Sequence, residues 1–277
     1  MRLTPRTLIP GSALQAARET YDWFRRLPAV PDAYLHPWRR ASLGRIRAMH
    51  DMHRGQRCFI IGNGPSLNRT DLTRLKGECT IGMNRIYLLF PELGFTATYF
   101  VAINDLVIEQ CAREIDALRM PKFIAWRSNR HFQHFSDDLI FLYTTYTGPR
   151  FAYDMTGRVW EGATVTNVAL QLAYYMGFTT VILIGVDHDF TTRGEANQTI
   201  VSNGADPDHF SPAYFGAGFR WQLPDLRTSE IGYGLAHAAF QRAGREVLDA
   251  TVGGKLTVFP KVQYDLLFPH PSSSLPA

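Results

Sequence analysis

Short apolar runs alternate with segments of helical period along the chain from residue 57 onward. The apolar runs lack a polar residue at every second position, which is typical of strands buried on both faces of a parallel sheet. They stand at residues 57–62, 79–84, 96–104, 121–126, 139–145, 179–187 and 245–251. Helical patterns stand between most of them, at residues 70–77, 86–95, 105–119, 163–178 and 229–245. This alternation predicts an α/β protein, Rossmann-like, with a mostly parallel sheet and helices on both faces.

The same pattern divides the 277 residues into three parts. Residues 1–56 predict a helical extension broken by proline, with one helix near 12–27, a break at 28–37 and a second helix near 41–53. Residues 57–260 predict a Rossmann-like, nucleotide-binding catalytic domain, and residues 261–277 a tail whose last nine residues are expected to be disordered. Within the domain, residues 188–227 form a long polar excursion of the kind that serves as a lid or binding loop.

Positive charge is concentrated at the amino-terminal end of the chain. The net charge is +4, but residues 1–57 alone carry eleven arginines against four acidic residues. Such an arm suits peripheral contact with an anionic membrane or a polyanionic substrate, and equally a solvated helix packed beside the domain. No apolar run reaches the roughly 20 residues of a membrane span, and the start lacks the apolar core of a signal peptide. We therefore expect a cytoplasmic protein, peripheral at the inner membrane face where the arm binds, without a nucleic-acid partner and with oligomerisation left open.

The first predicted strand ends in the glycine-rich turn IIGNGPSL. A turn of this kind lets backbone amides approach a phosphate, so Gly62, Gly64 and the amides near Ser66 are expected to hold phosphate oxygens. Leu67 stands where a third glycine of the dinucleotide fingerprint would be expected, and no GxxxxGK[ST] loop is present. The turn predicts a nucleotide site that is not one of the two common types.

Three of the first four predicted strands end in asparagine, namely Asn63, Asn84 and Asn104, and Asp105 follows the last of them. Asparagine donates and accepts hydrogen bonds and tolerates left-handed backbone, so one such residue is ordinary turn chemistry. Because ligands of parallel sheets bind beyond the carboxyl ends of the strands, three on one rim predict recognition of a base or ribose.

The strand at 179–187 is followed by Asp187-His188-Asp189. An Asp-x-Asp pattern binds Mg²⁺ or Mn²⁺ in some sugar-nucleotide transferases, because carboxylate oxygens suit these ions. The pattern is also short and frequent by chance, and an aspartate at a strand end often caps the next turn. We predict no metal site as the leading interpretation and keep Asp187 and Asp189 as the alternative ligands.

The polar excursion contains the one loop histidine with a plausible chemical role, His209. A loop histidine with a pKa near neutrality can take a proton from a sugar hydroxyl, and His188 is a rival base. Tyr214, Arg220 and Trp221 are candidates for contact with a leaving phosphate or an acceptor ring. Asp187 completes the predicted catalytic set.

The motifs IIGNGPSL, GMNR and GATVTNVALQLAYYMGFTTVILIGVD resemble the bacterial family of 6-hydroxymethylpterin diphosphokinase MptE-like proteins, which includes the central domain of Maf flagellin glycosyltransferases. More remotely they are similar to bacterial CMP-sialic acid sialyltransferases. That second resemblance implies that Asn63, Gly64 and Ser66 lie beside the cytidine nucleotide. It further implies that Asn84 and Asn104 contact the phosphate or sugar, and that Thr164 lies near the donor. The chain departs from the sialyltransferases at 188–189, where they carry a tyrosine, and in the placement of the catalytic histidine.

The resemblance and the residues together predict a glycosyltransferase of surface-glycan or glycoconjugate assembly. Its donor would be a nucleotide-activated sugar, most directly a CMP-linked sialic-acid-like or Kdo-like sugar, and its acceptor a glycan, with no tightly bound cofactor. The pterin-kinase resemblance implies a Mg²⁺-dependent diphosphokinase instead. A non-catalytic nucleotide-binding module is the third interpretation.

Overall fold

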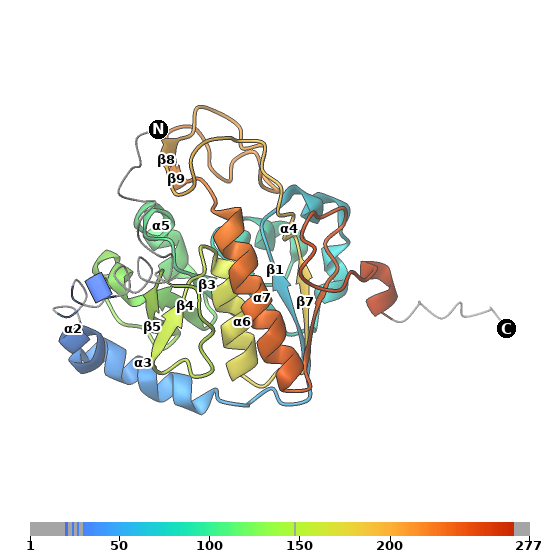
Figure 1. The fold of residues 1–277 in the computed structure, drawn as a ribbon. Helices are drawn as coiled ribbons and strands as arrows, with labels where there is room; N and C mark the ends of the chain where they lie inside the picture. Colours follow the sequence, from blue (N-terminus) through green and yellow to red (C-terminus); the bar gives the residue numbers. More distant parts are fainter. Residues whose placement is uncertain (1–19, 22–23, 25–26, 28–29, 147, 269–277) are drawn as a thin grey trace, which may run out of the picture.

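The computed structural model describes residues 20–21, 24, 27, 30–146 and 148–268. The helix expected near residues 12–27 lies largely outside the described residues, and so does the tail from residue 269. The described chain forms one eight-stranded sheet with helices packed on both faces (Figure 1).

Every neighbouring pair of strands in this sheet is parallel. The strand order is β10-β7-β1-β2-β3-β4-β5-β6. The strands are β1 (Arg57–Ile61), β2 (Thr80–Met83), β3 (Tyr99–Ala102), β4 (Lys122–Ala125), β5 (Leu139–Thr145), β6 (Arg158–Trp160), β7 (Thr180–Ile184) and β10 (Glu246–Asp249). The chain therefore proceeds outward from β1 to β6 and then returns to the other side of β1, which makes the β1–β7 junction the topological switch point.

Alternate side chains of each strand enter two separate hydrophobic cores. Cys58 and Ile60 of β1 pack with helices α6 (Val165–Tyr175) and α7 (Leu226–Arg242) on one face. Phe59 and Ile61 pack on the other face with helix α5 (Asp105–Ala117) and the 3-10 helices η3 (Pro65–Arg69) and η4 (Leu72–Leu75). Because both faces are covered, the central strands are buried along almost their whole length, and this explains the absence of an apolar–polar alternation.

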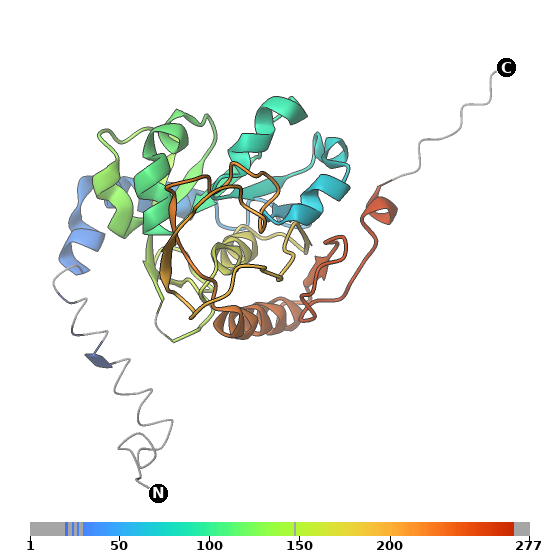
Figure 2. The same ribbon diagram turned by 90° about the horizontal axis from the view of Figure 1, so that it is seen from above.

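The remaining elements are short and lie around the sheet. They are α2 (Val30–Leu35), α3 (Pro37–Ala48), η5 (Ile86–Leu89), α4 (Phe90–Leu93), η6 (Trp126–His131), η7 (Tyr264–Leu267) and the antiparallel hairpin of β8 (Thr199–Val201) and β9 (Arg220–Gln222). The insertion at 188–227 carries this hairpin and arches over the carboxyl ends of the strands (Figures 1 and 2). The predicted α/β class, parallel sheet and two-sided helical cover are confirmed.

The proline-rich stretch at 28–37 was expected to be a break, and that expectation is wrong for its second part. Helix α2 occupies Val30–Leu35, and α3 begins at Pro37 rather than at residue 41. Proline is tolerated in a first helical turn because its missing amide has no partner there anyway. Helix α3 packs on the domain: the Arg45 guanidinium donates to the carbonyls of Ser136 and Leu139.

The segment predicted to be helical at 70–77 forms only the 3-10 helix η4, and its cap is Asp71, whose Oδ1 accepts from the Thr73 amide at 3.1 Å. Strand β6 was not predicted because its three residues carry too little pattern, and the β8–β9 hairpin was hidden in a polar loop for the same reason. No helix of the described residues has the length and apolar character needed to cross a membrane.

The switch point is closed by two glycines that face each other. Gly62 follows β1 and Gly185 follows β7, and the Gly62 amide donates to the Ile184 carbonyl at 2.7 Å. A Cβ on Gly62 would lie 2.2 Å from the Gly185 carbonyl oxygen, which is closer than any real contact. Gly185 has φ +66, and a Cβ there would meet the Leu67 side chain at 2.6 Å. The two turns can approach this closely because both residues lack a side chain.

We expect Gly62→Ala to lower the free energy of unfolding by about 1–3 kcal/mol, because the added methyl overpacks a backbone contact that cannot move aside. Chemical denaturation of the purified variant measures the loss. Gly44→Ala is the matched control: Gly44 lies exposed in α3 with open space around its Cβ, so alanine there should raise stability by up to ~1 kcal/mol. Equal stability of the two variants would contradict this account of the switch point.

Candidate functional site

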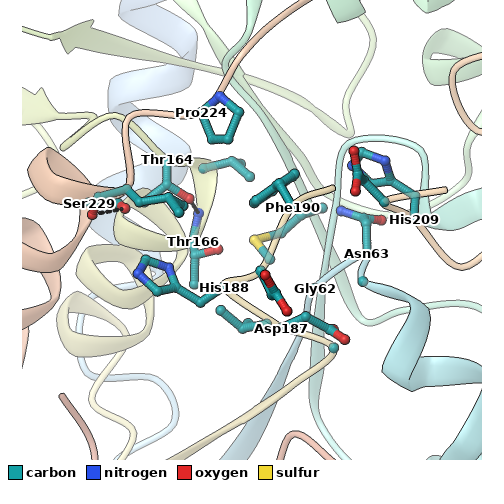
Figure 3. Close-up of a pocket in the computed structure, with 18 of the residues that line it drawn as sticks. Gly62, Asn63, Thr164, Thr166, Asp187, His188, Phe190, His209, Pro224 and Ser229 are labelled. Atoms are coloured by element: carbon teal, nitrogen blue, oxygen red, sulfur yellow. Dashed lines mark hydrogen bonds between the residues drawn. The ribbon is translucent and has the colours of Figure 1, made fainter. Parts of the chain in front are cut away.

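A cavity of about 150 Å³ opens at the switch point, beyond the carboxyl ends of β1, β2 and β7. This is where ligands of open parallel sheets bind. Figure 3 shows Asn63 and His209 on one side of it and His188 and Ser229 on the other. Of the predicted site residues, those lining this cavity are Gly62, Asn63, Gly64, Asn84, Thr164, Asp187, His188, Asp189 and His209.

A second cavity, of about 760 Å³, adjoins the first toward β3, β6 and the β8–β9 hairpin. The two share part of their walls, including Asn84, Thr164, Phe190 and His209. Asn104, Asp105 and the predicted contact residue Trp221 line the larger cavity, as do Arg127 and Glu161, which no sequence pattern marked. The two cavities form one cleft with a narrow end at the switch point and a wide end under the hairpin.

The glycine turn does not use its backbone amides as the sequence analysis expected. The Gly64 amide donates to the Gly185 carbonyl at 2.9 Å, and the Ser66 amide donates to Asp187 Oδ1 at 3.1 Å. With the Gly62 amide bound to Ile184, all three proposed phosphate donors are occupied inside the protein. The glycines serve the approach of the two turns, and these three amides are not available to a phosphate.

Asp187 is held by Ser66 from the facing turn. Its Oδ2 accepts from the Ser66 hydroxyl at 2.6 Å, in addition to the amide bond at Oδ1. A Cβ on Gly64 would lie 1.8 Å from the same Oδ2, so the glycine also makes room for this carboxylate. Burial raises the pKa of Asp187, and the hydrogen bonds from Ser66 oppose that shift only in part. Asp187 therefore fastens the two turns together at the floor of the narrow cavity.

The three strand-end asparagines take two different roles. Asn63 Oδ1 and Asn84 Oδ1 are buried without a hydrogen-bond partner, and both residues line the narrow cavity. Asn84 also has φ +50, the left-handed conformation that asparagine tolerates. Asn104 instead caps α5, since its Oδ1 accepts from the Leu106 amide at 3.0 Å. Asn63 and Asn84 therefore keep an oxygen that can accept a hydrogen bond from a ligand, while the side-chain oxygen of Asn104 caps α5.

Three helices direct their amino-terminal ends at the cleft: residues at the start of α5, α6 and α7 line one or both cavities. Asp105 stands in the first turn of α5, and Asp225 caps α7, so these two helix ends already face a carboxylate. Helix α6 is capped by the uncharged Thr164 and has no acidic residue in its first turn. Its positive end is therefore the one left for an anion from outside.

His209 lies between the two cavities and is oriented by Asp206. The Nδ1 atom stands 2.8 Å from Asp206 Oδ2, and the Asp206 side chain is only 2% exposed. The imidazole ring is stacked on Tyr214, with ring centroids 4.0 Å apart and planes within 6°. Asp206 was not among the predicted site residues; its position three residues before a loop histidine was the available signal.

The rival base, His188, is engaged on the opposite wall. Its Nε2 stands 3.0 Å from Glu230 Oε1, and its backbone has φ +55. Ala163, beside the start of α6, also has positive φ, at +60. Left-handed backbone at residues other than glycine or asparagine costs about 1–3 kcal/mol and concentrates at functional sites, which supports this cleft as one.

Three predicted site residues line neither cavity. Ser66 is buried against Asp187, and Tyr214 is fully buried under His209. Arg220 is directed to Glu109 of α5, at 3.0 Å between Nη2 and Oε2, and so fastens β9 to the domain. The placement of these three residues does not favour direct contact with a ligand. Each of them supports a residue or an element that borders the cleft.

Among the residues that the structure describes, no group of three or more His, Cys, Asp or Glu side chains is placed to hold a metal ion. In the narrow cavity, both Asp187 oxygens accept from Ser66, and both Asp208 oxygens accept from Thr191 and Thr192. Asp189 lines the cavity beside them. A Mg²⁺ ion that bridges to substrate phosphates through one or two carboxylates is compatible with this donor set.

The raised pKa of Asp187 gives a pH test of its burial. A carboxyl whose pKa is higher in the folded state stabilises the fold while protonated, and that contribution is lost as pH rises through the folded pKa. We expect Asp187→Asn, which cannot ionise, to gain stability relative to the wild type as pH rises from about 4 to 7, measured as unfolding free energy across that range. Ser66→Ala should steepen the wild-type dependence, because it removes a hydrogen bond to the ionised form. A difference that stays constant with pH would refute the assignment.

Comparison with known proteins identifies the family. The model of a family described as 6-hydroxymethylpterin diphosphokinase MptE-like matches residues 40–193. No curated protein matches the chain. Among solved structures, the MAf glycosyltransferase from Magnetospirillum magneticum AMB-1 is similar at a TM-score of 0.47 and 13% identity, over 81% of this chain and 38% of that one. Because the family model covers more than half of the sequence, the chain belongs to the MptE-like family.

Proposed function

We propose that this protein is a glycosyltransferase that moves a sugar from a nucleotide-activated donor to a hydroxyl of a glycan acceptor. The observation that carries the proposal is the Asp206–His209 pair at the boundary of the two cavities. One cavity offers a place for the activated group and the other a place for the acceptor. The pair lies where a proton has to be removed for transfer between them.

The geometry of the pair favours a general base. An ionised carboxylate only accepts hydrogen bonds, so the proton on His209 is placed on Nδ1, toward Asp206. The lone pair is then on Nε2, the nitrogen that is not bound to Asp206. Asp206 is itself fixed by the Asp208 amide at 2.9 Å and the Phe215 amide at 3.1 Å. A base held in one tautomer and one orientation is the arrangement that histidine-dependent group transfer uses.

The donor is assigned to the switch-point side of the cleft. Its phosphate would lie at the amino-terminal end of α6, and its base or ribose would donate hydrogen bonds to Asn63 Oδ1 and Asn84 Oδ1. We infer a CMP-linked sialic-acid-like or Kdo-like sugar from the sequence resemblance to sialyltransferases. The setting would be assembly of a surface glycan or glycoconjugate in the cytoplasm, with the basic amino-terminal arm against an anionic membrane.

In the transfer step, His209 Nε2 removes the proton from an acceptor hydroxyl. The acceptor oxygen forms a bond to the anomeric carbon as the bond from that carbon to the phosphate oxygen breaks. The phosphate leaves with the bonding electron pair, and the positive end of α6 stabilises the charge that develops on it.

A Mg²⁺-dependent diphosphokinase is the second candidate, favoured by the name of the MptE-like family and by the acidic lining of the narrow cavity. Asp187, Asp189 and Asp208 would repel a bare polyphosphate, and a divalent cation would offset that repulsion. A non-catalytic nucleotide-binding module is the third candidate, and it requires no role for the Asp206–His209 pair.

A thermal-shift screen of the full chain against CMP, CDP, UDP, GDP and ATP, each with and without Mg²⁺, separates these candidates. We expect CMP to raise the melting temperature most, with a shift that does not depend on Mg²⁺. A larger shift with ATP that disappears on chelation would favour the diphosphokinase and count against the glycosyltransferase.

Variants of the pair test the base directly. We expect His209→Ala and Asp206→Asn each to lower kcat by at least about 100-fold, the usual worth of a general base or of its orientation. The reason for the second loss is that an asparagine amide can donate to Nδ1 and so favours the proton on Nε2. Turnover of the nucleotide-sugar identified by the screen measures both losses.

The nucleotide-induced thermal shift of both variants should stay close to that of the wild type. His237→Gln is the matched control, because His237 packs against Phe259 and lines neither cavity, and it should keep full activity. Unchanged turnover in His209→Ala and Asp206→Asn would remove the catalytic role of the pair.

A further inference from the structure

The larger cavity has the size and the surface of a carbohydrate site. Its volume of about 760 Å³ lies within the range of roughly 300–1,000 Å³ that small-molecule sites occupy. The walls combine aromatic side chains with neutral hydrogen-bonding groups. The aromatic set is Tyr146, Phe190, Phe215 and Trp221, and the neutral polar set includes Asn104, Asn197, Thr199, Gln222 and Thr228. Sugar rings use both kinds of surface, since their C–H faces stack on aromatic rings and their hydroxyls need polar partners.

Each Arg, Asp and Glu side chain on these walls already has an ion-pair or hydrogen-bond partner inside the protein. The Arg127 guanidinium is paired with Glu161 and also donates to the Thr144 hydroxyl at 2.8 Å. Asp105 accepts from Arg130 and from the Ser128 hydroxyl at 2.7 Å. Asp225 accepts from the amide and the hydroxyl of Thr228, at 2.9 and 2.7 Å. An anionic ligand would meet three carboxylates here, and the one guanidinium, that of Arg127, is already paired with Glu161.

One buried donor in the wall has no partner. Trp221 is only 6% exposed, and its indole Nε1 is buried without a hydrogen-bond acceptor. The ring packs on Phe215, with centroids 5.1 Å apart, and lies 6.3 Å from the His209 ring. An unpaired buried indole N–H costs free energy, and an oxygen of a ligand in the cavity would satisfy it.

We propose that the larger cavity binds an uncharged pyranoside as the acceptor, with a ring or hydroxyl oxygen accepting from Trp221 Nε1. The role of this sugar as acceptor rests on the proposed function, but its binding to the cavity can be measured without turnover. The proposal places neutral sugars ahead of uronic acids and other anionic sugars, because the Arg127 guanidinium is already paired and only the start of α6, shared with the narrow cavity, offers positive polarity. The closeness of Trp221 to His209 would place an acceptor hydroxyl within reach of the base.

Ligand-observed saturation-transfer NMR on the full chain tests the proposal. The probes are the methyl pyranosides of glucose, galactose, mannose and N-acetylglucosamine, together with methyl galactosiduronate, which differs from the galactoside by its carboxylate. We expect at least one neutral probe to bind and the uronate to bind at least about tenfold more weakly than the galactoside, or not at all. Equal or tighter binding of the uronate, or no signal from any neutral probe, would overturn the proposal.

Trp221→Phe separates the hydrogen bond from the ring surface. It keeps an aromatic side chain against Phe215 and removes only the N–H donor, so the neutral probe should bind about three- to tenfold more weakly, the usual worth of one hydrogen bond. Trp126→Phe is the matched control: Trp126 is buried against Phe141 and lines neither cavity, so its variant should bind the probe as the wild type does. Unchanged affinity in Trp221→Phe would remove the assigned contact.

The nucleotide-induced thermal shift, measured on the same samples, keeps this inference apart from the proposed function. A shift with CMP but no pyranoside binding would leave the donor assignment standing and defeat the acceptor site. Pyranoside binding without any nucleotide shift would do the reverse, and should Trp221→Phe not fold, the comparison of galactoside with uronate in the wild type still decides.

Discussion

The backbone contact between Gly62 and Gly185 is the constraint on which the rest of the cleft depends. It brings the turns after β1 and β7 together at the switch point, closer than any pair of side chains would allow. Ser66 can then reach Asp187, and the interior of the turn is closed by the protein's own hydrogen bonds. Because the turn amides already donate to groups of the protein, the side chains and helix ends around the turn are the groups left for a ligand.

The placement of the proposed base follows from the same turn. The Phe210 amide donates to the Asn63 carbonyl at 2.9 Å, and Asn68 Nδ2 donates to the Phe210 carbonyl, also at 2.9 Å. The residue next to His209 is thus fastened to the glycine turn from both sides. Asp206 and Tyr214 then hold the ring in place, through the 2.8 Å contact at Nδ1 and through stacking. A histidine on a long insertion acquires a defined position because the neighbouring residue is hydrogen-bonded to the segment that follows β1.

The sequence alone predicted the parallel sheet and the rim on which most of the candidate residues lie, because both follow from local patterns. Strands buried on two faces are apolar runs in the sequence. The carboxyl ends of parallel strands lie at one edge of the sheet, whichever strands are neighbours. The phosphate role of the Gly62–Ser66 amides could not be judged in the same way, because β1 pairs with a strand more than a hundred residues later in the chain. Asp206 lies in a loop, where neither period nor capping marks a residue. Its role depends on which groups the insertion meets after it folds back, and so does the indole contact of Trp221, which the sequence marked only as an aromatic residue of that insertion.

The distribution of charge along the cleft separates its two ends. At α5 and α7 the helix ends face Asp105 and Asp225, so the part of the wide cavity away from α6 has no positive helix end without a carboxylate. At α6 an uncharged threonine caps the helix, beside a backbone held in the left-handed region at Gly162 and Ala163. Helix dipoles act over about one turn, so α6 is the helix end best suited to an anion, against the opposing charge of Asp187, Asp189 and Asp208 in the same narrow cavity. A donor phosphate at α6 and an uncharged acceptor under the hairpin would then lie on opposite sides of His209. That is the order in which a base has to stand for transfer from one to the other.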